Sequence, residues 1–259
     1  MKYKFQKPPL GIPINRGHPL GRSVVHCLMN EGTGNQVKDL SGNNRNGTIY
    51  GTAPLWKAGK YGTGLYLPGT DEYVKCATPA IPSDLSILFW YAPDNITDNK
   101  YMSDFGDNNE FACIAGYQDG YYNVYGDAYP TGKAADSQIP MSGAGILDFV
   151  CWVKSGTNLK GYVNGVLKSN VTISQGDFTP SANFEIGRSY GGVSFIKGRF
   201  EQVILYNRAL LTSEIAKLYR EPFCMFEREP IELWMAAMGG APPTVKAMLY
   251  YQEMMRSAS

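Results

Sequence analysis

The feature that most constrains the fold of this chain is a regular alternation along residues 24–206. Short runs rich in β-branched and aromatic residues, such as residues 86–90 (Ser-Ile-Leu-Phe-Trp) and 149–154 (Phe-Val-Cys-Trp-Val-Lys), are separated by clusters of Gly, Pro, Asn, Asp and Ser. Runs of this length and composition are typical of strands, and the residues between them are those that form tight turns. About a dozen such runs at this spacing predict an all-β sandwich of antiparallel sheets.

Two local signals add detail to this prediction. Asn164-Gly165 supplies the positive φ angles of a type I′ turn, so Tyr162 and Leu167 are expected in neighbouring antiparallel strands. Residues 213–220 show helical periodicity, with Thr212 or Ser213 as the expected N-cap and Pro222 as the stop. The predicted core includes Trp90, Trp152, Tyr162, Ile186 and Val203.

The chain divides into three parts. Residues 1–22 contain several prolines and no periodic pattern, so we expect an extended arm that is not buried on its own sandwich. Residues 23–220 contain the sandwich, and residues 221–259 form a second tail. The apolar side chains of this tail are too many to remain in water, so a partner is expected to cover them. The residues expected to make this attachment are Phe223, Phe226, Leu233 and Trp234.

Charge and cysteine content exclude several classes of protein. The formal net charge is +1, from 24 basic and 23 acidic side chains, which argues against nucleic acid as a partner. No apolar stretch is long enough to span a membrane, and prolines stand where the apolar segment of a signal peptide would lie. The five cysteines lack the spacing of a metal site and are expected to be reduced packing residues.

Several segments together resemble the laminin-G-like, concanavalin A-like jelly-roll family. The match spans about residues 24–219 in the family's order and is carried by residues 26–34, 39–48, 59–62, 65–69, 86–90, 162–165, 184–187 and, most specifically, 198–210 followed by 213–215. The resemblance implies a two-sheet antiparallel jelly-roll sandwich with one short C-terminal helix and extended tails.

The flanks carry a second resemblance. Residues 8–20 and 218–226 resemble the ends of uncharacterised laminin-G-like proteins in phage and prophage genomes. This implies a non-enzymatic structural or accessory protein on the virion surface, a decoration protein or fibre knob, whose partners are capsid or tail subunits or further copies of itself. The alternatives are a free calcium-dependent carbohydrate-binding lectin and, more remotely, a glycoside hydrolase on the same fold.

The laminin-G-like resemblance also implies a calcium site. In this family the ion often lies between an Asp-x-Ser-Gly-Asn loop and an acidic pair in the last long strand, so Asp39, Asn43 and Glu201 are the expected ligands. The strand departs from the pattern, because the usual Asp-Glu pair is Glu201-Gln202 here. The alternative interpretation is an Asx-turn, in which Asp39 and Asn43 bond their own backbone.

Residues 117–129 contain five tyrosines and are a candidate glycan-binding segment. A period of two places alternate residues on one face of a strand, where tyrosine rings can stack on pyranose rings while neighbouring polar groups bind hydroxyls. The expected glycan contacts are Tyr117, Tyr121, Asn123, Tyr125 and Asp127. The alternative is that these tyrosines pack one sheet and its covering loops.

No catalytic residues are predicted. Glycoside hydrolysis needs two carboxylates about 5–10 Å apart across a sugar. Jelly-roll glucanases place them on one strand as Glu-x-Asp-x-x-Glu, a segment that this sequence lacks. Glu227, Glu229 and Glu232 have partial spacing, but Pro230 between them is incompatible with a central strand. We therefore expect that the protein is not an enzyme.

Overall fold

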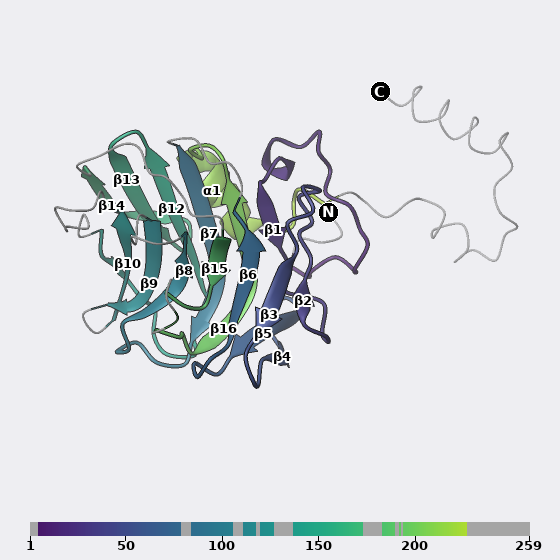
Figure 1. Ribbon diagram of the computed structural model, residues 1–259. Coiled ribbons are helices and arrows are strands. Elements are labelled where there is room, and N and C mark those ends of the chain that lie inside the picture. Colours follow the sequence, from purple (N-terminus) through teal and green to yellow (C-terminus); the bar gives the residue numbers. More distant parts are fainter. Residues whose placement is uncertain are drawn as a thin grey trace, which may run out of the picture. The chain divides into compact units, whose positions relative to one another are not determined.

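The computed structural model describes residues 5–78, 84–105, 111–117, 120–126, 137–172, 183–189, 192 and 194–226 of the 259-residue chain. Two antiparallel sheets face one another, as the sequence predicted (Figure 1). The first sheet has the order β14 (Val166–Thr172), β13 (Asn158–Val163), β12 (Asp148–Ser155), β7 (Leu85–Pro93), β16 (Gly198–Tyr206), β5 (Thr63–Leu67) and β4 (Leu55–Ala58), with β1 (Val25–Cys27) paired to β16.

The second sheet has the order β11 (Ile139–Pro140), β10 (Tyr121–Gly126), β9 (Phe111–Tyr117), β8 (Lys100–Asp104), β15 (Asn183–Ile186), β6 (Tyr73–Ala77), β3 (Gly47–Tyr50) and β2 (Gln36–Val37). The order of both sheets crosses the sequence repeatedly, as a jelly roll requires. The predicted hairpin is confirmed: Asn164 and Gly165 have φ angles of 51° and 77°, and Tyr162 pairs with Leu167.

The main core lies between the two sheets and follows the two-residue period of the strands. It includes Phe89 on β7, Trp152 on β12 and Val203 on β16, facing Ile186 on β15. The five residues predicted to be buried (Trp90, Trp152, Tyr162, Ile186 and Val203) are all buried.

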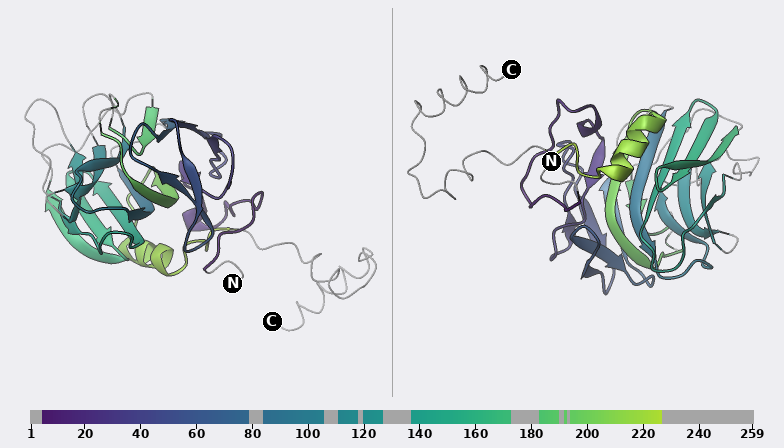
Figure 2. Two further views of the ribbon diagram at one scale, coloured as in Figure 1. Left: turned by 90° about the horizontal axis from the view of Figure 1, so that it is seen from below. Right: turned by 180° about the vertical axis from the view of Figure 1, so that it is seen from behind.

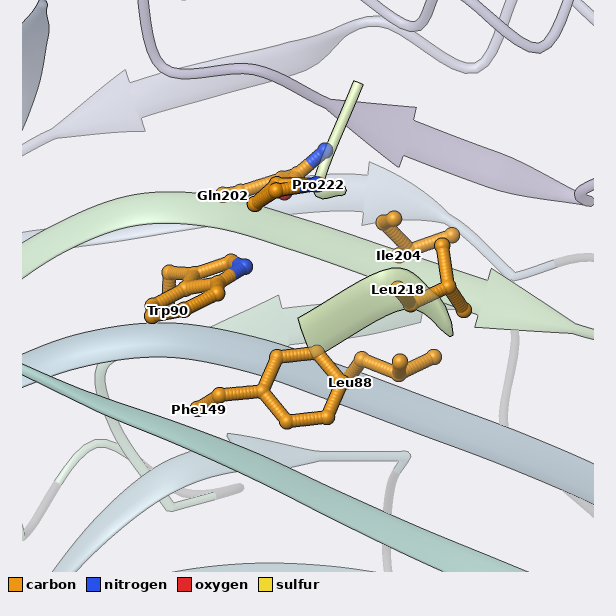
Figure 3. Close-up of a pocket in the computed structure, with 7 residues that line it drawn as sticks. All are labelled: Leu88, Trp90, Phe149, Gln202, Ile204, Leu218 and Pro222. Carbon is orange, nitrogen blue, oxygen red and sulfur yellow. The ribbon is translucent and has the colours of Figure 1, made fainter. Parts of the chain in front are cut away.

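A second apolar layer, which we call the outer core, covers the other face of the first sheet. The alternate residues of the same strands, such as Trp90, Phe149 and Ile204, point into it. Helix α1 (Thr212–Arg220) lies along this face (Figure 2) and contributes Ile215 and Leu218. A gap of about 180 Å³ beneath the helix is lined by Leu88, Trp90, Phe149, Gln202, Ile204, Leu218 and Pro222 (Figure 3) and leaves no space for a water molecule.

The predicted N-cap of this helix was wrong. Leu211, not Thr212 or Ser213, occupies the cap position, and its side chain cannot accept a hydrogen bond. Glu214, the third residue of the helix, supplies the other half of a capping box: its carboxylate accepts the backbone N–H of Leu211 at 2.9 Å and pairs with Arg208 at 2.7 Å. None of the described helices is long and apolar enough to span a membrane.

The arm and the start of the C-terminal tail also pack on the outer core, which corrects two expectations. Ile14 and Leu20 of the arm are buried there, beside Phe223 and Phe226. The two segments bind each other, since the N–H of Asn15 donates to the carbonyl of Met225 at 2.8 Å and Ile14 forms a bridge with Phe226. The period-two pattern concealed this surface, because the central strands are apolar on both faces.

Candidate functional site

The predicted calcium ligands are already occupied by hydrogen bonds. The Asp39 carboxylate accepts the backbone N–H groups of His26, Ser41 and Arg45 at 2.9–3.0 Å and the Ser41 hydroxyl at 2.8 Å. The bond from the backbone N–H of Ser41, two residues after Asp39, makes an Asx-turn. This confirms the alternative interpretation for Asp39. The amide of Asn43 donates to the carbonyls of Ser23 and Val24 at 3.3 and 3.4 Å and so holds the entry to β1.

Glu201 is held in the same way by a different loop. Its fully buried carboxylate accepts the N–H groups of Lys60 and Tyr61 at 2.9 and 3.1 Å and pairs with Arg199 at 3.1 Å. Calcium requires six to eight oxygen ligands, and N–H donors surround both carboxylates, so these residues as arranged do not fit the ion. Nor do three or more His, Cys, Asp or Glu side chains gather into a metal site anywhere in the described part of the chain.

Gln202, which stands where the family has an acid, lies beside a buried histidine. Its Nε2 is 2.9 Å from Nε2 of His26. Burial lowers the pKa of His26 to about 4, against the raising effect of Asp39, so the ring is neutral at pH 7. A neutral amide beside a neutral imidazole avoids a buried charge, which explains the replacement physically.

Only part of the tyrosine-rich segment, residues 117–129, has been shown to be exposed. Tyr121 is exposed, but Asn123 is fully buried, and its Oδ1 accepts the Ser137 hydroxyl at 3.2 Å. The expectation that Asn123 contacts a glycan was therefore wrong, because its side chain is fully buried and bonded to Ser137. Tyr122 packs in the core and donates its hydroxyl to Asp148 at 3.0 Å. The side chains of Tyr117, Tyr125 and Asp127 lie outside the described residues, so their role stays a prediction.

Two of the four predicted attachment residues lie in the described part of the chain, and both are buried. Phe223 and Phe226 are buried in the outer core of their own chain, so the expectation that they need a partner was wrong. Leu233 and Trp234 lie outside the described residues.

The outer face of the second sheet carries a set of residues that the sequence analysis did not identify, which we call the aromatic platform: Tyr50, Tyr73, Glu185, Arg188 and Phe195. Ile49, Val74, Phe184 and Ile186 point into the main core, so their alternate neighbours Tyr50, Tyr73 and Glu185 point away from it. Tyr50 pairs with Tyr73 across β3 and β6, and Phe195 forms a bridge with Arg188 just after β15.

The rings and the guanidinium form a continuous stack. The rings of Tyr50 and Tyr73 lie 4.9 Å apart with an interplanar angle of 11°, and the Cζ atom of Arg188 lies 3.5 Å from the centroid of Tyr73. The Phe195 ring is 6.5 Å from Tyr73. Tyr50 ends the stack with 43% of its surface exposed. Partial burial raises the pKa of Tyr73, although the adjacent guanidinium lowers it.

A buried ion pair fixes the stack from below. Arg188 donates from Nε and one terminal nitrogen to the two oxygens of Glu185 at 2.6 and 2.8 Å, and Glu185 is only 2% exposed. This bidentate geometry holds the planar guanidinium in one orientation. Across the sheet, Glu185 has Lys75 on one side and Asp104 on the other as its direct neighbours. The platform therefore combines one exposed ring, Tyr50, and two half-buried rings, Tyr73 and Phe195, with fixed polar groups.

The pair Asp104 and Glu185 brings two buried carboxyl-bearing residues to directly opposite positions on neighbouring strands. Side chains in such positions are close enough for joint chemistry, with Cβ atoms about 5 Å apart. Arg188 occupies both oxygens of Glu185, however, so Glu185 is not free to transfer a proton to a glycosidic oxygen. As arranged, Glu185 is the partner that orients Arg188.

The sequence contains no signal that would have assembled this platform. Tyr50, Tyr73 and Glu185 lie on three different strands, whereas Arg188 and Phe195 lie in the segment between β15 and β16. The most distant members, Tyr50 and Phe195, are 145 positions apart in the sequence. An outward tyrosine in a short strand is common. Only the register of β3, β6 and β15, together with the bridge between Arg188 and Phe195, brings these residues together.

Fold and site together define a lectin-like β-sandwich with an aromatic and polar outer face. Residues 68–216 match the sequence profile of the concanavalin A-like lectin/glucanases superfamily, a laminin-G-type profile. Because the match covers more than half of the chain, the protein belongs to this superfamily. No curated protein matches the sequence.

Solved structures with similar folds include both enzyme-associated and toxin domains. Domain 4 of AbnA, an extracellular arabinanase from Geobacillus stearothermophilus solved with arabinotriose, has a TM-score of 0.63 at 20% identity, covering 76% of this chain and 98% of that one. The botulinum neurotoxin type G receptor binding domain has a TM-score of 0.62 at 13% identity, covering 77% and 51%.

The binding domain of paraclostridial mosquitocidal protein 1 has a TM-score of 0.62 at 18% identity, covering 76% and 52%. This chain thus spans about half the length of these toxin domains and nearly the whole of the arabinanase domain. At these identities the likeness concerns the fold.

Proposed function

We propose that the protein is a carbohydrate-binding module without catalytic activity and that the aromatic platform is its glycan-binding surface. The single observation that carries this proposal is the stack of Arg188, Tyr73 and Tyr50 on a solvent-facing sheet, held by the buried pair with Glu185. The Tyr50 ring, which ends the stack, presents its free apolar face to the C–H groups of a sugar, and the fixed polar groups of the platform lie beside it to bind hydroxyls. The similar arabinanase domain, solved with arabinotriose, supports the ligand class.

Rigidity is the second argument. A flexible surface loses conformational entropy when it binds a ligand, whereas a surface fixed beforehand does not. The bidentate pair and the ring stack fix Tyr73 and Arg188 before binding. A buried ion pair on the outer face of a sheet contributes little net stability compared with apolar residues, so a role in positioning a binding surface accounts for it better.

The wider role that we propose is display on a virion surface, which rests on the resemblance of residues 8–20 and 218–226 to the ends of phage proteins. Both segments pack on their own sandwich, so attachment to capsid or tail subunits falls to residues 227–259, including Leu233 and Trp234. Deletion of residues 227–259 should leave the sandwich folded and abolish incorporation into particles. Normal incorporation of this truncated protein would contradict the proposal.

The test of glycan binding uses a glycan array followed by calorimetric titration with the best ligand and with arabinotriose. Tyr50→Ala should weaken binding about tenfold or more, equivalent to at least ~1.4 kcal/mol. Phe5→Ala is the matched control, because Phe5 is an aromatic residue with 63% of its surface exposed on the arm. Equal affinity of wild type and Tyr50→Ala for every glycan bound, with unchanged melting temperature, would refute the platform as the site.

A further inference from the structure

Residues 55–67, which comprise β4, a short turn and β5, form a hairpin at the edge of the first sheet, and we call it the basic hairpin. Among the described strands β4 pairs with β5 alone, and three of its four residues are exposed. Leu55, the first of them, leaves 46% of its surface exposed. The basic hairpin shares no residue with the aromatic platform, which lies on the second sheet. This edge is therefore a separate surface that a partner can reach.

Two lysines of the basic hairpin are held against tyrosine rings. Nζ of Lys57 lies 3.2 Å from the ring centroid of Tyr66, and Nζ of Lys60 lies 5.3 Å from the ring centroid of Tyr61. Both lysines are exposed, and neither forms an ion pair with another described residue. A cation over an aromatic face keeps its charge and its outward N–H donors, while the ring limits its movement. The two ammonium groups are thus positioned without being neutralised.

The carboxylates beside the basic hairpin already have partners. Glu201 is fully buried and pairs with Arg199 at 3.1 Å. Asp94 lies 3.6 Å from Nζ of Lys197 and accepts the Tyr66 hydroxyl at 2.6 Å. Each of these carboxylates is matched by one cation, so the charges of the two lysines on the hairpin remain uncompensated. This surface is therefore more positive than the chain as a whole, whose formal net charge is +1, and it attracts anions.

A glycine brings a third cation to the same edge. Gly64 on β5 pairs with Lys57 on β4, and a Cβ atom at Gly64 would lie 2.9 Å from Cγ of Arg199. The absence of a side chain at Gly64 therefore lets Arg199 lie over β5, next to the position of Lys57. The Arg199 side chain remains 25% exposed while it pairs with Glu201. Cationic N–H donors thus gather along one open edge of the sheet.

We infer that the basic hairpin is a second interaction surface and that its partner is an acidic polysaccharide, a glycan chain with carboxylate groups along its length. The ammonium groups of Lys57 and Lys60 pair with successive carboxylates of the chain, and exposed Leu55 contacts the C–H face of a sugar ring. Cations spread along an open edge match a ligand whose anionic groups repeat. The inference stands apart from the proposed function, because charge on the first sheet recognises this ligand.

The experiment is a calorimetric titration of the full chain with oligogalacturonate at low and at high NaCl concentration. Wild type should bind with a Kd on the order of 0.1–1 mM at low salt, as expected for a few exposed ion pairs. High salt should weaken this binding about tenfold or more, because it screens the charges. The double variant Lys57→Gln/Lys60→Gln should lose about tenfold or more at low salt, whereas Lys57→Arg/Lys60→Arg, which keeps both charges, should retain the affinity.

Lys160→Gln/Lys168→Gln is the matched control, because it removes the same charge from β13 and β14 at the opposite end of the same sheet. It should bind oligogalacturonate as wild type does, and both glutamine variants should keep the melting temperature of wild type.

No binding of wild type to oligogalacturonate, or an equal loss of affinity in both glutamine variants, would overturn the inference. Equal or tighter binding to phosphatidylserine vesicles or to DNA would overturn it as well, because the surface would then read charge alone. Tyr50→Ala should leave the affinity for oligogalacturonate unchanged. Its effect on neutral glycans is scored separately and tests the proposed function alone.

Discussion

Phe223→Ala tests whether the start of the C-terminal tail belongs to the folded domain. Phe223 is 2% exposed, and its ring centroid lies 5.7 Å from Tyr61 and 6.5 Å from Phe226 in the outer core. Truncation of a buried Phe to Ala costs about 3–5 kcal/mol, the sum of lost transfer free energy and the cavity left behind. A partner-binding residue on a free tail would instead cost almost nothing in the isolated protein.

The assay is thermal and denaturant unfolding of the full chain. A loss of 3–5 kcal/mol lowers the melting temperature by roughly 6–20 °C in a domain of this size. Leu211→Ala is the matched control, because Leu211 is 67% exposed and its truncation should stay within about 0.5 kcal/mol of wild type. A change of melting temperature in Phe223→Ala no larger than in this control would refute the assignment of residues 222–226 to the domain core.

Three further predictions follow from buried polar groups. Lys7, which donates from Nζ to the carbonyls of Met29 and Thr63, has its pKa lowered by burial from 10.5 to about 7, against the raising effects of Glu201 and Glu31. Between about pH 7 and pH 10.5, the Lys7 side chain therefore carries a proton in the unfolded chain that it lacks in the folded chain. The free energy of unfolding of wild type relative to Lys7→Met should then rise from about pH 7 to pH 10 in urea titrations, and a flat difference would contradict this. Arg188→Ala should lower the free energy of unfolding by about 3–5 kcal/mol, because it leaves Glu185 buried without its counter-charge; a loss below 1 kcal/mol in denaturant unfolding would show that water reaches Glu185. Excess chelator should leave the melting temperature unchanged, whereas Asp39→Ala should lower the stability by about 1–3 kcal/mol through the N–H donors it leaves unpaired; a chelator-dependent shift would restore calcium at this loop.

The candidate sites differ in whether neighbouring or distant residues of the sequence determine them. Asp39 and Ser41 lie two residues apart, so local chemistry was enough to give their Asx-turn as the alternative to calcium, and the hydrogen bonds of the folded chain decided between the two. Strand alternation assigned Asn123 to the surface, and only the folded structure showed that it is buried and bonded to Ser137, 14 residues away. The aromatic platform could not be predicted, because Tyr50, Tyr73 and Arg188 meet through the register of three strands that are not consecutive in the sequence.

The sequence by itself determined the all-β class, the Asn164-Gly165 hairpin, the position of the helix and the main core, because each depends on turn chemistry or on a period that neighbouring residues share. The tertiary structure alone decided that the first sheet is buried on both faces and that residues 14–20 and 223–226 pack on its outer side. A strand that is buried on both faces shows no alternation, so the pattern cannot reveal how many layers cover it. Which segments cover the sheet depends on contacts between residues such as Ile14 and Phe226, which are far apart in the sequence and meet only after folding.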